Sequence, residues 1–206
     1  MTTRLDEKAF HKAVNLIREA QHIVALTGAG SSTPSGIPDF RTAESGLWTR
    51  YQPMEVASLS AFRRQPEDFF EWLRPLAQHL RTAQPNPAHL AMADLEQQGY
   101  LQAIITQNFD GLHQRAGSKQ VIEVHGSMNS MTCIGCYCQY ETETLIESYI
   151  DEGFMPRCQE CNHILKPDVV LFEEQLPATT WVEARQQASA CDLMIVAGSS
   201  LVVMPV

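Results

Sequence analysis

The sequence of 206 residues has no apolar run that approaches the roughly 20 residues needed to span a bilayer. Its first 20 residues also lack the apolar stretch and the small-residue cleavage site of a secretory signal peptide. Instead, apolar side chains recur there at helical spacing and predict a surface helix packed on the core: Phe10, Ala13, Val14 and Ile17. These absences argue against a membrane protein, and we expect a cytoplasmic protein with reduced thiols.

Positive charge is also scarce. The chain has 15 Lys and Arg residues against 24 Asp and Glu residues, which gives a formal net charge of −9. This balance argues against a nucleic-acid partner and mildly favours a basic peptide partner. A hydrophobic content of 44% in a chain of this length is sufficient for one sizeable core with a smaller subdomain.

The sequence lacks the complete glycine fingerprint of common dinucleotide-binding enzymes. An apolar run from Ile23 to Leu26 leads into Gly28-Ala29-Gly30, but Thr33 stands where the third glycine is expected. Alone, this turn also fits an ordinary strand-to-helix connection. The proline-stiffened loop after it ends in Asp39-Phe40-Arg41, which together with the strand-end groups below favours a bound nucleotide whose phosphates meet main-chain N–H groups.

Short apolar runs alternate with helical patterns along most of the chain. The helical patterns include 86–98 and 179–190, and the apolar runs are 22–27, 101–106, 121–125, 168–172 and 192–197. This alternation predicts an α/β fold with a mostly parallel sheet and helices on both faces. Residues 42–83 predict a helical insertion, and residues 128–165 contain most of the cysteines with little apolar periodicity.

Polar motifs follow the expected strands at their carboxyl ends. They are Gly28-Ala29-Gly30, Gln107-Asn108-Phe109-Asp110, His125-Gly126, Phe172-Glu173-Glu174 and Gly198-Ser199-Ser200. Ligands of open α/β sheets bind in the crevice beyond these ends, so we expect all five motifs to face one crevice.

His125 is the candidate general base, because imidazole titrates near neutrality and this histidine ends a buried strand before a glycine. The alternative is a core or capping histidine, as expected for the other six. Gln107, Asn108 and Asp110 offer amide and carboxylate groups suited to ribose hydroxyls, a carboxamide or a water. Their alternative role is helix N-capping.

The cysteines predict a zinc site. Two C-x-x-C pairs separated by 21 residues can complete a tetrahedral S4 site: Cys133, Cys136, Cys158 and Cys161. Four thiolates leave no open position, so the zinc is expected to be structural. Cys138 could replace Cys136 at poorer spacing, and Cys191 is expected to be a small apolar residue.

A zinc ribbon that binds nucleic acid is the main non-enzymatic alternative. Between 128 and 165 the only Lys or Arg is Arg157, among many acids, so phosphate backbones would be repelled. The stretch Lys166–Phe172 allows two interpretations. It could pair with an extended peptide through its main chain, or it could be an ordinary core strand.

Taken together, these motifs resemble the sirtuins, the NAD-dependent protein-lysine deacylases, and look closest to the bacterial deacetylases. The resemblance runs from about residue 22 to the last residue, in the family's order. It is carried by GAG-x-S-x-x-S-G-I-P-D-F-R, T-Q-N-x-D-G-L-H, V-H-G, two C-x-x-C pairs, V-V-L-F and G-S-S-L-V-V-x-P.

The resemblance implies a Rossmann-like NAD-binding domain formed by 1–41, 84–127 and 166–206. It also implies a small domain built from the helical insertion 42–83 and the zinc-ribbon module 128–165. The implied NAD-binding residues are Gly28, Ala29, Gly30, Ser32, Asp39, Phe40, Arg41, Gln107, Asn108, Asp110, His125, Gly198, Ser199 and Ser200. His125 and Asn108 would be catalytic. An acyl-lysine peptide would pair near Val169, Val170, Leu171 and Phe172.

In the implied reaction the acyl oxygen attacks the ribose C1′ of NAD and displaces nicotinamide. His125 then removes a ribose hydroxyl proton, and a cyclic intermediate collapses with water. The products are free lysine, nicotinamide and an acyl-ADP-ribose ester. Three residues depart from the family pattern: Ser31 replaces an apolar residue, Phe109 replaces Ile or Val, and Glu173 replaces the glycine of F-G-E. Leu73 and Leu76 align with the Tyr and Arg of succinyl-preferring members, which favours uncharged acyl groups.

Sirtuins continue for roughly one strand-helix-strand unit beyond G-S-S-L, so we expect this chain to lack its C-terminal end. Two alternatives to deacylation follow. One is protein ADP-ribosylation in the same pocket, and the other is an inactive fragment that only binds peptide.

Overall fold

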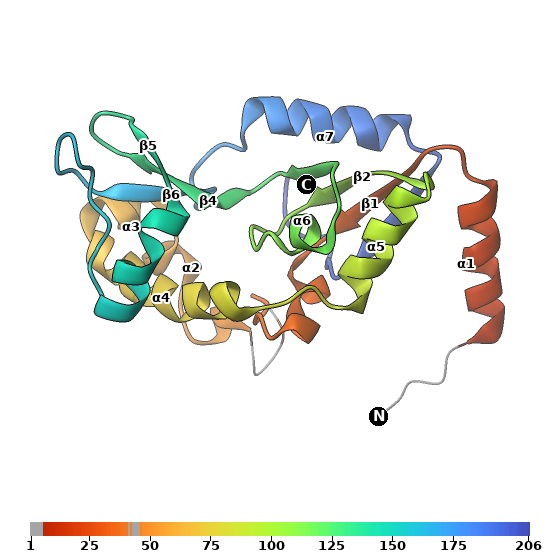
Figure 1. Ribbon diagram of the computed structural model, residues 1–206, viewed down its shortest axis with the longest axis horizontal. Coiled ribbons are helices and arrows are strands. Elements are labelled where there is room, and N and C mark those ends of the chain that lie inside the picture. The colour runs from red at the N-terminus through yellow and green to blue at the C-terminus, as the bar shows by residue number, and fades with distance from the viewer. Residues whose placement is uncertain (1–5, 41, 43–45) are drawn as a thin grey trace.

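The computed structural model describes residues 6–40, 42 and 46–206. Two parts lie side by side along the long axis of the molecule (Figure 1). One contains a four-stranded sheet flanked by helices, and the other contains helices packed beside a three-stranded sheet. No helix in these described ranges is long and apolar enough to cross a membrane.

The larger sheet is entirely parallel, in the order β3-β2-β1-β7. Its strands are β1 (Ile23–Thr27), β2 (Leu101–Thr106), β3 (Val121–Glu123) and β7 (Leu193–Ala197). All five residues of the inner strand β1 are buried, because strands flank it on both sides and helices cover both faces. The residues of β7, at the sheet edge, are half-buried or exposed.

Helices cover both faces of this sheet, as predicted for a Rossmann-like fold. On one face Ile23, Ala25 and Ile104 pack with side chains of α5 (Pro87–Gln97) and with the end of α1 (Glu7–Glu19). On the other face Val24 and Leu26 pack toward α7 (Ala178–Ala190). The two sets alternate along β1, because successive side chains of a strand point to opposite faces.

The first helix is less packed than we expected. Asp6 caps α1 by accepting hydrogen bonds from the N–H groups of Lys8 and Ala9. No residue of α1 is buried, and Phe10 is 51% exposed. The predicted surface helix is therefore present, and its contact with the core is limited: Val14 and Ile17 are half-buried, and Ile17 packs against the core on one face of the sheet.

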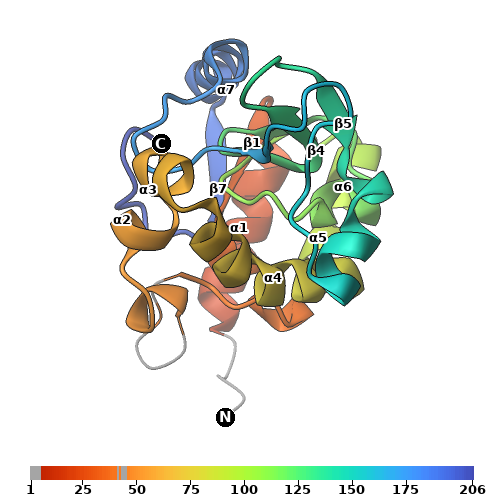
Figure 2. The ribbon, with the colours of Figure 1, turned by 90° about the vertical axis from the view of Figure 1, so that its left-hand side faces the viewer.

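The helical insertion contains α2 (Pro53–Val56), α3 (Leu59–Arg64) and α4 (Pro66–Thr82). Its core contains aromatic rings in edge-to-face contact, a geometry that aromatic pairs prefer. The rings are those of Phe62, Phe69, Phe70 and Tyr149, each at most 2% exposed. Figure 2, which faces this end of the molecule, shows α2, α3 and α4 beside the smaller sheet.

The smaller sheet is antiparallel, in the order β5-β4-β6. It contains β4 (Gly126–Cys133), β5 (Gln139–Glu141) and β6 (Leu165–Val169). The run 168–172 was expected to be a strand of the parallel sheet, which is wrong: the strand covers 165–169 and pairs with β4. The hydroxyls of Ser130 and Thr132 on β4 donate to the Asp168 carboxylate at 2.5 and 2.6 Å, which holds β6 in place.

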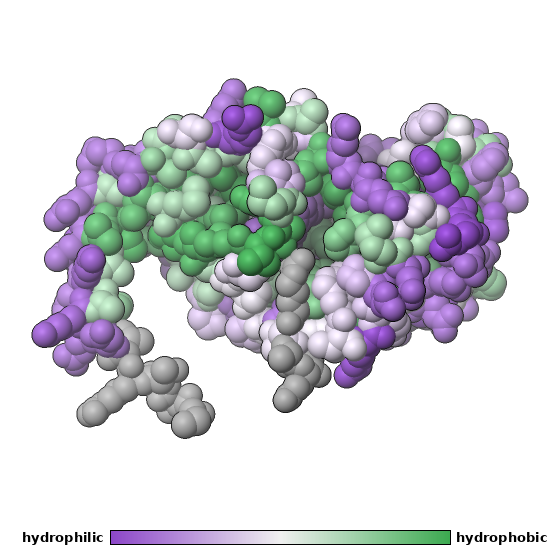
Figure 3. All heavy atoms as spheres, turned by 180° about the vertical axis from the view of Figure 1, so that it is seen from behind, coloured by the Kyte–Doolittle hydropathy of each residue, from purple (hydrophilic) through white to green (hydrophobic). Residues whose placement is uncertain are grey.

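This sheet extends from Gly126 to Val169, so the expected boundaries at 127/128 and 165/166 fall inside β4 and β6. The remaining helix, α6 (Leu112–Ala116), connects the end of β2 to β3. Seen from behind, the molecule has a hollow near its middle with apolar surface beside it (Figure 3).

Candidate active site

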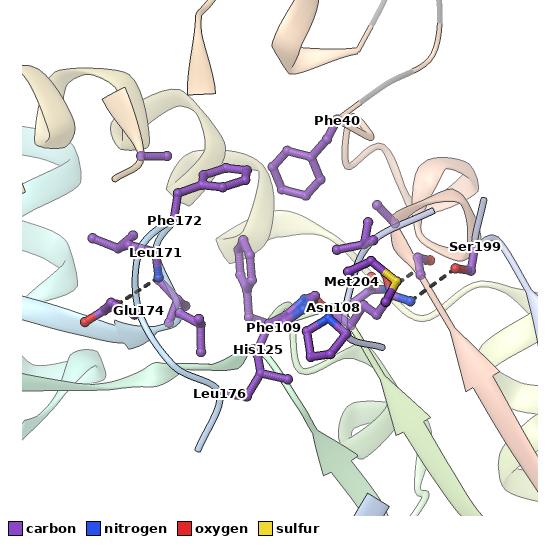
Figure 4. A pocket seen from close by; sticks show the side chains of 18 of the residues that line it. Phe40, Asn108, Phe109, His125, Leu171, Phe172, Glu174, Leu176, Ser199 and Met204 are labelled. Carbon is purple, nitrogen blue, oxygen red and sulfur yellow. Dashed lines mark hydrogen bonds between the residues drawn. The ribbon is translucent and has the colours of Figure 1, made fainter. Parts of the chain in front are cut away.

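A cavity of about 1000 Å³ lies between the carboxyl ends of the parallel strands and the smaller part of the molecule. Most of the predicted site residues line it, and Figure 4 shows several of them converging from separate segments. They are Gly28, Ala29, Gly30, Asp39, Phe40, Gln107, Asn108, His125, Val169, Val170, Leu171, Phe172, Gly198, Ser199 and Ser200. Arg41 lies outside the described residues.

The glycine turn is shaped by its contact with the loop after β7. Gly28 N–H donates to the Ala197 carbonyl at 3.1 Å, and Gly30 N–H donates to the Gly198 carbonyl at 2.9 Å. A Cβ atom on Gly28 or Gly30 would lie 2.8 or 2.9 Å from the Gly198 oxygen. Both glycines therefore allow two loops to meet. Their N–H groups, which we expected to face a pyrophosphate, are already hydrogen-bonded within the protein.

The Asn108 side chain is hydrogen-bonded to the same turn. Its Nδ2 lies 3.2 Å from the Gly28 carbonyl oxygen, and equally 3.2 Å from the hydroxyl oxygens of Ser31 and Ser32. Because Nδ2 is a donor, these contacts fix the orientation of the amide. Asn108 thus lines the cavity and braces the glycine turn.

Ser32 and Asp110 lie beneath the turn and do not line the cavity. The Ser32 hydroxyl donates to Asp110 Oδ2 at 2.6 Å, and Leu112 N–H donates to Asp110 Oδ1 at 2.9 Å. Asp110 therefore links the start of α6 to the glycine turn, although the N-cap residue of α6 is Gly111 and not Asp110. The NAD contacts that the family resemblance implies for Ser32 and Asp110 stay a prediction.

His125 follows β3 at the point where the two sheets meet. Its Nδ1 lies 3.0 Å from the Gln107 carbonyl oxygen, and its own carbonyl accepts a hydrogen bond from Val170 N–H at 2.8 Å. Gly126 has φ +76°, and a Cβ there would collide with the Asp168 carbonyl oxygen. The glycine after His125 therefore serves the close approach of β4 and β6.

A polar network inside the sheet supports these strand ends. Thr27 and Thr106 are paired across β1 and β2, and the Thr27 hydroxyl donates to the Thr106 hydroxyl at 2.8 Å. His113 Nε2 lies 3.0 Å from Thr27 Oγ1, and Asn108 N–H donates to Thr106 Oγ1 at 3.0 Å. Burial, reinforced by the nearby His89, lowers the pKa of His113 to about 4, so the ring is neutral near pH 7.

Glu123, at the end of β3, is a carboxyl group with a strongly shifted pKa. Burial, reinforced by the charge of Asp110, raises its pKa to about 7, although hydrogen bonds from Gln114 and Ser127 act in the opposite direction. A substantial fraction of this group is therefore protonated near neutral pH.

Aromatic rings form one wall of the cavity. Phe40 stacks on Trp48 with ring centroids 5.1 Å apart, and Trp48 stacks on Trp72 at 5.7 Å. Phe109 approaches Phe40 at 6.3 Å, and Figure 4 shows its ring pointing toward those of Phe40 and Phe172. Trp48 and Trp72 were not predicted as cavity residues, because their stacking joins segments that are distant in sequence.

The segment after β6 runs along the cavity, and the N–H groups of Val170, Leu171 and Phe172 all donate to acceptors within the protein. Phe172 N–H donates to the Ala57 carbonyl at 3.0 Å, and Leu59 N–H donates to the Phe172 carbonyl at 3.0 Å. The segment therefore connects the helical insertion to the His125 loop. Leu73 lines the cavity beside it, whereas Leu76 is buried in the core and does not.

The four predicted cysteines form one cluster. Their sulfur atoms all lie within 4.8 Å of one another, with Cys133 to Cys161 and Cys136 to Cys158 both at 3.4 Å. Four converging thiols fit a tetrahedral metal site of the zinc type. Cys138 and Cys191 are not part of this cluster, which confirms Cys136 as the second cysteine of the site.

A parallel sheet with a cavity at the carboxyl ends of its strands is typical of α/β proteins that bind nucleotides. The sequence profile of the Sir2 family matches residues 28–205. The chain therefore belongs to the Sir2 family.

The relatives are curated deacylases and solved Sir2 structures. "NAD-dependent protein deacylase 2" of Archaeoglobus fulgidus is 48% identical over 200 residues, which cover 97% of this chain and 78% of the relative. A Sir2 variant solved with a deacetylated peptide and 3′-O-acetyl ADP ribose has a TM-score of 0.89 at 42% identity, with 95% of this chain and 78% of that chain covered. Sir2Tm bound to a propionylated peptide has a TM-score of 0.84 at 40% identity, with 98% and 78% covered.

Proposed function

We propose that this chain removes acyl groups from protein lysines by transferring them to the ADP-ribose part of NAD, most readily as a deacetylase. One observation carries the proposal: the glycine turn, His125 and the segment Val170–Phe172 line a single cavity. An NAD site and a peptide site are thereby continuous. The relatives' names and the ligands of the solved Sir2 structures support the same activity.

Small residues suit the proposed NAD end of the cavity. Gly28, Ala29, Gly30 and Gly198 leave room for phosphates, and the Gln107 amide, which donates to Ser199 Oγ at 3.1 Å, joins the β2 and β7 loops beside them. Asp39 and Phe40 close the nicotinamide end in this proposal. Bound NAD supplies an electrophilic ribose carbon and a leaving group, nicotinamide.

The residues of the chain then position the substrate and move the protons. The stacked aromatic wall excludes water around the acyl-lysine, and the main chain of the Val169–Phe172 segment aligns the peptide. His125 accepts a proton from a ribose hydroxyl, and Asn108 keeps the glycine turn in position beside it. The four-cysteine site holds the small sheet that carries β6 and does no chemistry.

The charged groups of the cavity disfavour acidic acyl chains. Among the described lining residues there is no Lys or Arg, whereas Asp39, Glu173 and Glu174 are acidic. A succinyl or malonyl carboxylate would find no cationic partner there. We also propose acyl-lysine proteins as partners rather than nucleic acids, and a cytoplasmic location, which suits four reduced thiols.

The experiment compares acetyl-lysine and succinyl-lysine versions of one peptide, with and without NAD. We expect the acetyl group to be removed only when NAD is present. The kcat/KM for the succinyl-lysine peptide is expected to be at least about 100-fold lower than that for the acetyl-lysine peptide. Deacetylation that does not need NAD, or that is undiminished in His125→Ala, would refute the proposal. Radiolabel moving from NAD onto protein would favour ADP-ribosylation instead.

A further inference from the structure

Glu173 occupies a position that the family pattern gives to glycine, and its backbone shows why a glycine is expected there. Its φ is +75°, in the left-handed region that side chains with a Cβ rarely adopt. Such a conformation persists only where surrounding interactions stabilise it. The contacts of the Glu173 side chain supply that stabilisation.

The Glu173 carboxylate binds the first turn of α3. Ser60 N–H donates to Oε2 at 2.9 Å, and the Ser60 hydroxyl donates to Oε1 at 3.1 Å. An anion near the start of a helix is favourable, because the first N–H groups have no partner within the helix. Both oxygens of one carboxylate are thus used by one residue of α3.

The first turn of α3 depends on the segment that lines the cavity. Leu59 N–H donates to the Phe172 carbonyl at 3.0 Å, and Ser60 N–H donates to Glu173. The next N–H, that of Ala61, is satisfied locally, by Ser58 Oγ at 3.1 Å. Two successive amides of the helix are therefore capped by Phe172 and Glu173.

The next residue, Glu174, also holds this segment in place, through contacts with Leu171 and with Lys166 of β6. Glu174 Oε2 accepts a hydrogen bond from Leu171 N–H at 2.8 Å and forms an ion pair with Lys166 Nζ at 3.1 Å. The segment Leu171–Glu174 is thereby tied to β6 by Glu174 and to α3 by Glu173. A glycine at 173 would keep the main-chain contact between Phe172 and Leu59 but would lose the side-chain contact with Ser60.

We infer that Glu173 is a positioning residue for the acyl-peptide: by clamping the cavity segment to α3, it pre-organises the main chain that the peptide pairs with. This inference rests on the proposed function. Because the clamp lies at the peptide end of the cavity, its loss acts on peptide binding and leaves the NAD end unchanged.

The test compares Glu173→Gly with Glu173→Ala. Glycine accepts φ +75° without strain but removes the clamp, whereas alanine removes the clamp and keeps the strain. We expect KM for an acetyl-lysine peptide to rise on the order of fivefold in Glu173→Gly and further in Glu173→Ala. The KM for NAD and kcat are expected to stay within about twofold. Glu183→Gln, on exposed α7, removes the same charge elsewhere and is expected to match the parent.

A readout independent of activity is amide hydrogen exchange over residues 57–62 and 170–174. We expect faster exchange there in both Glu173 variants and unchanged exchange in Glu183→Gln. If Glu173→Gly binds peptide as well as the parent and retains this protection, the inference is overturned. If the parent shows no NAD-dependent deacylation at all, the proposed function fails, and the exchange measurement alone decides whether the clamp exists.

Discussion

His125 Nδ1 lies 3.0 Å from the main-chain carbonyl oxygen of Gln107. A carbonyl oxygen can only accept a hydrogen bond, so Nδ1 carries the hydrogen and Nε2 is the basic nitrogen of the neutral ring. Gln107 directly follows β2, so the same backbone that places Asn108 under the glycine turn also fixes the tautomer of His125. The end of β2 thus organises the base and the turn together.

The first prediction concerns this histidine. His125→Asn is expected to lower kcat for deacetylation by about 100-fold or more, because no general base then faces the ribose. The dissociation constant for NAD, measured by calorimetry, should change by no more than a few fold. A variant that retains most of its turnover would assign the proton transfer to another group.

The second prediction concerns the metal. The purified chain is expected to contain one zinc ion, and Cys136→Ser should lose it and lower Tm by about 10 °C, since a structural metal contributes to folding. Cys138→Ser is the matched control and should retain the ion, because Cys138 is not in the cluster. Equal loss of zinc in both variants would contradict this assignment.

The third prediction is a pH dependence caused by Glu123. Its pKa is raised from 4.5 to about 7 in the folded protein, so burial disfavours the charged form. The associated stability is present below pH 4.5 and is lost as the pH rises through 7. Glu123→Gln stays neutral, so it should gain about 2 kcal/mol relative to the parent between pH 4.5 and 8.

Urea unfolding of both proteins across this pH range measures the effect. The stability difference isolates Glu123 from His113, whose lowered pKa acts in the opposite direction as the pH falls below 6.5. Curves that run parallel from pH 4.5 to 8 would show that Glu123 is ionised normally.

The fourth prediction uses two glycines with positive φ. A Cβ on Gly198 would overlap the main chain of Gly30 and Ser31, whereas one on Gly36 would meet nothing within 4 Å. Gly36→Ala is therefore expected to cost about 1 kcal/mol of backbone strain. Gly198→Ala should cost about 3 kcal/mol or more and weaken NAD binding, because it separates the two loops. Thermal unfolding and NAD titration of the pair check this, and equal effects would contradict the close approach.

The positions of the site motifs could be predicted from sequence because they depend on local patterns. Apolar runs located the parallel strands, and the groups at their carboxyl ends had to meet at one edge. The C-x-x-C spacing similarly identified the four metal ligands. These inferences need no knowledge of which distant segments touch.

The remaining features of the fold and the site depend on contacts between segments that are distant in the sequence. The run 168–172 is apolar in either sheet, so composition could not show that β6 pairs with β4. We expected Gly28 to make room for a phosphate. The atom nearest to a Cβ at this position is instead the carbonyl oxygen of Gly198, 170 positions later in the chain. From the sequence, Glu173 could be described only as a replacement of the family's glycine, because its partner, Ser60, lies far away along the chain.

The measurement that tests the central claim most directly is a product analysis of the wild-type chain with NAD and an acetyl-lysine peptide. Mass spectrometry should show free lysine, nicotinamide and acetyl-ADP-ribose formed in equal amounts, with none of the three formed when NAD is omitted. Release of acetate without nicotinamide, or of nicotinamide without acetyl-ADP-ribose, would contradict the account.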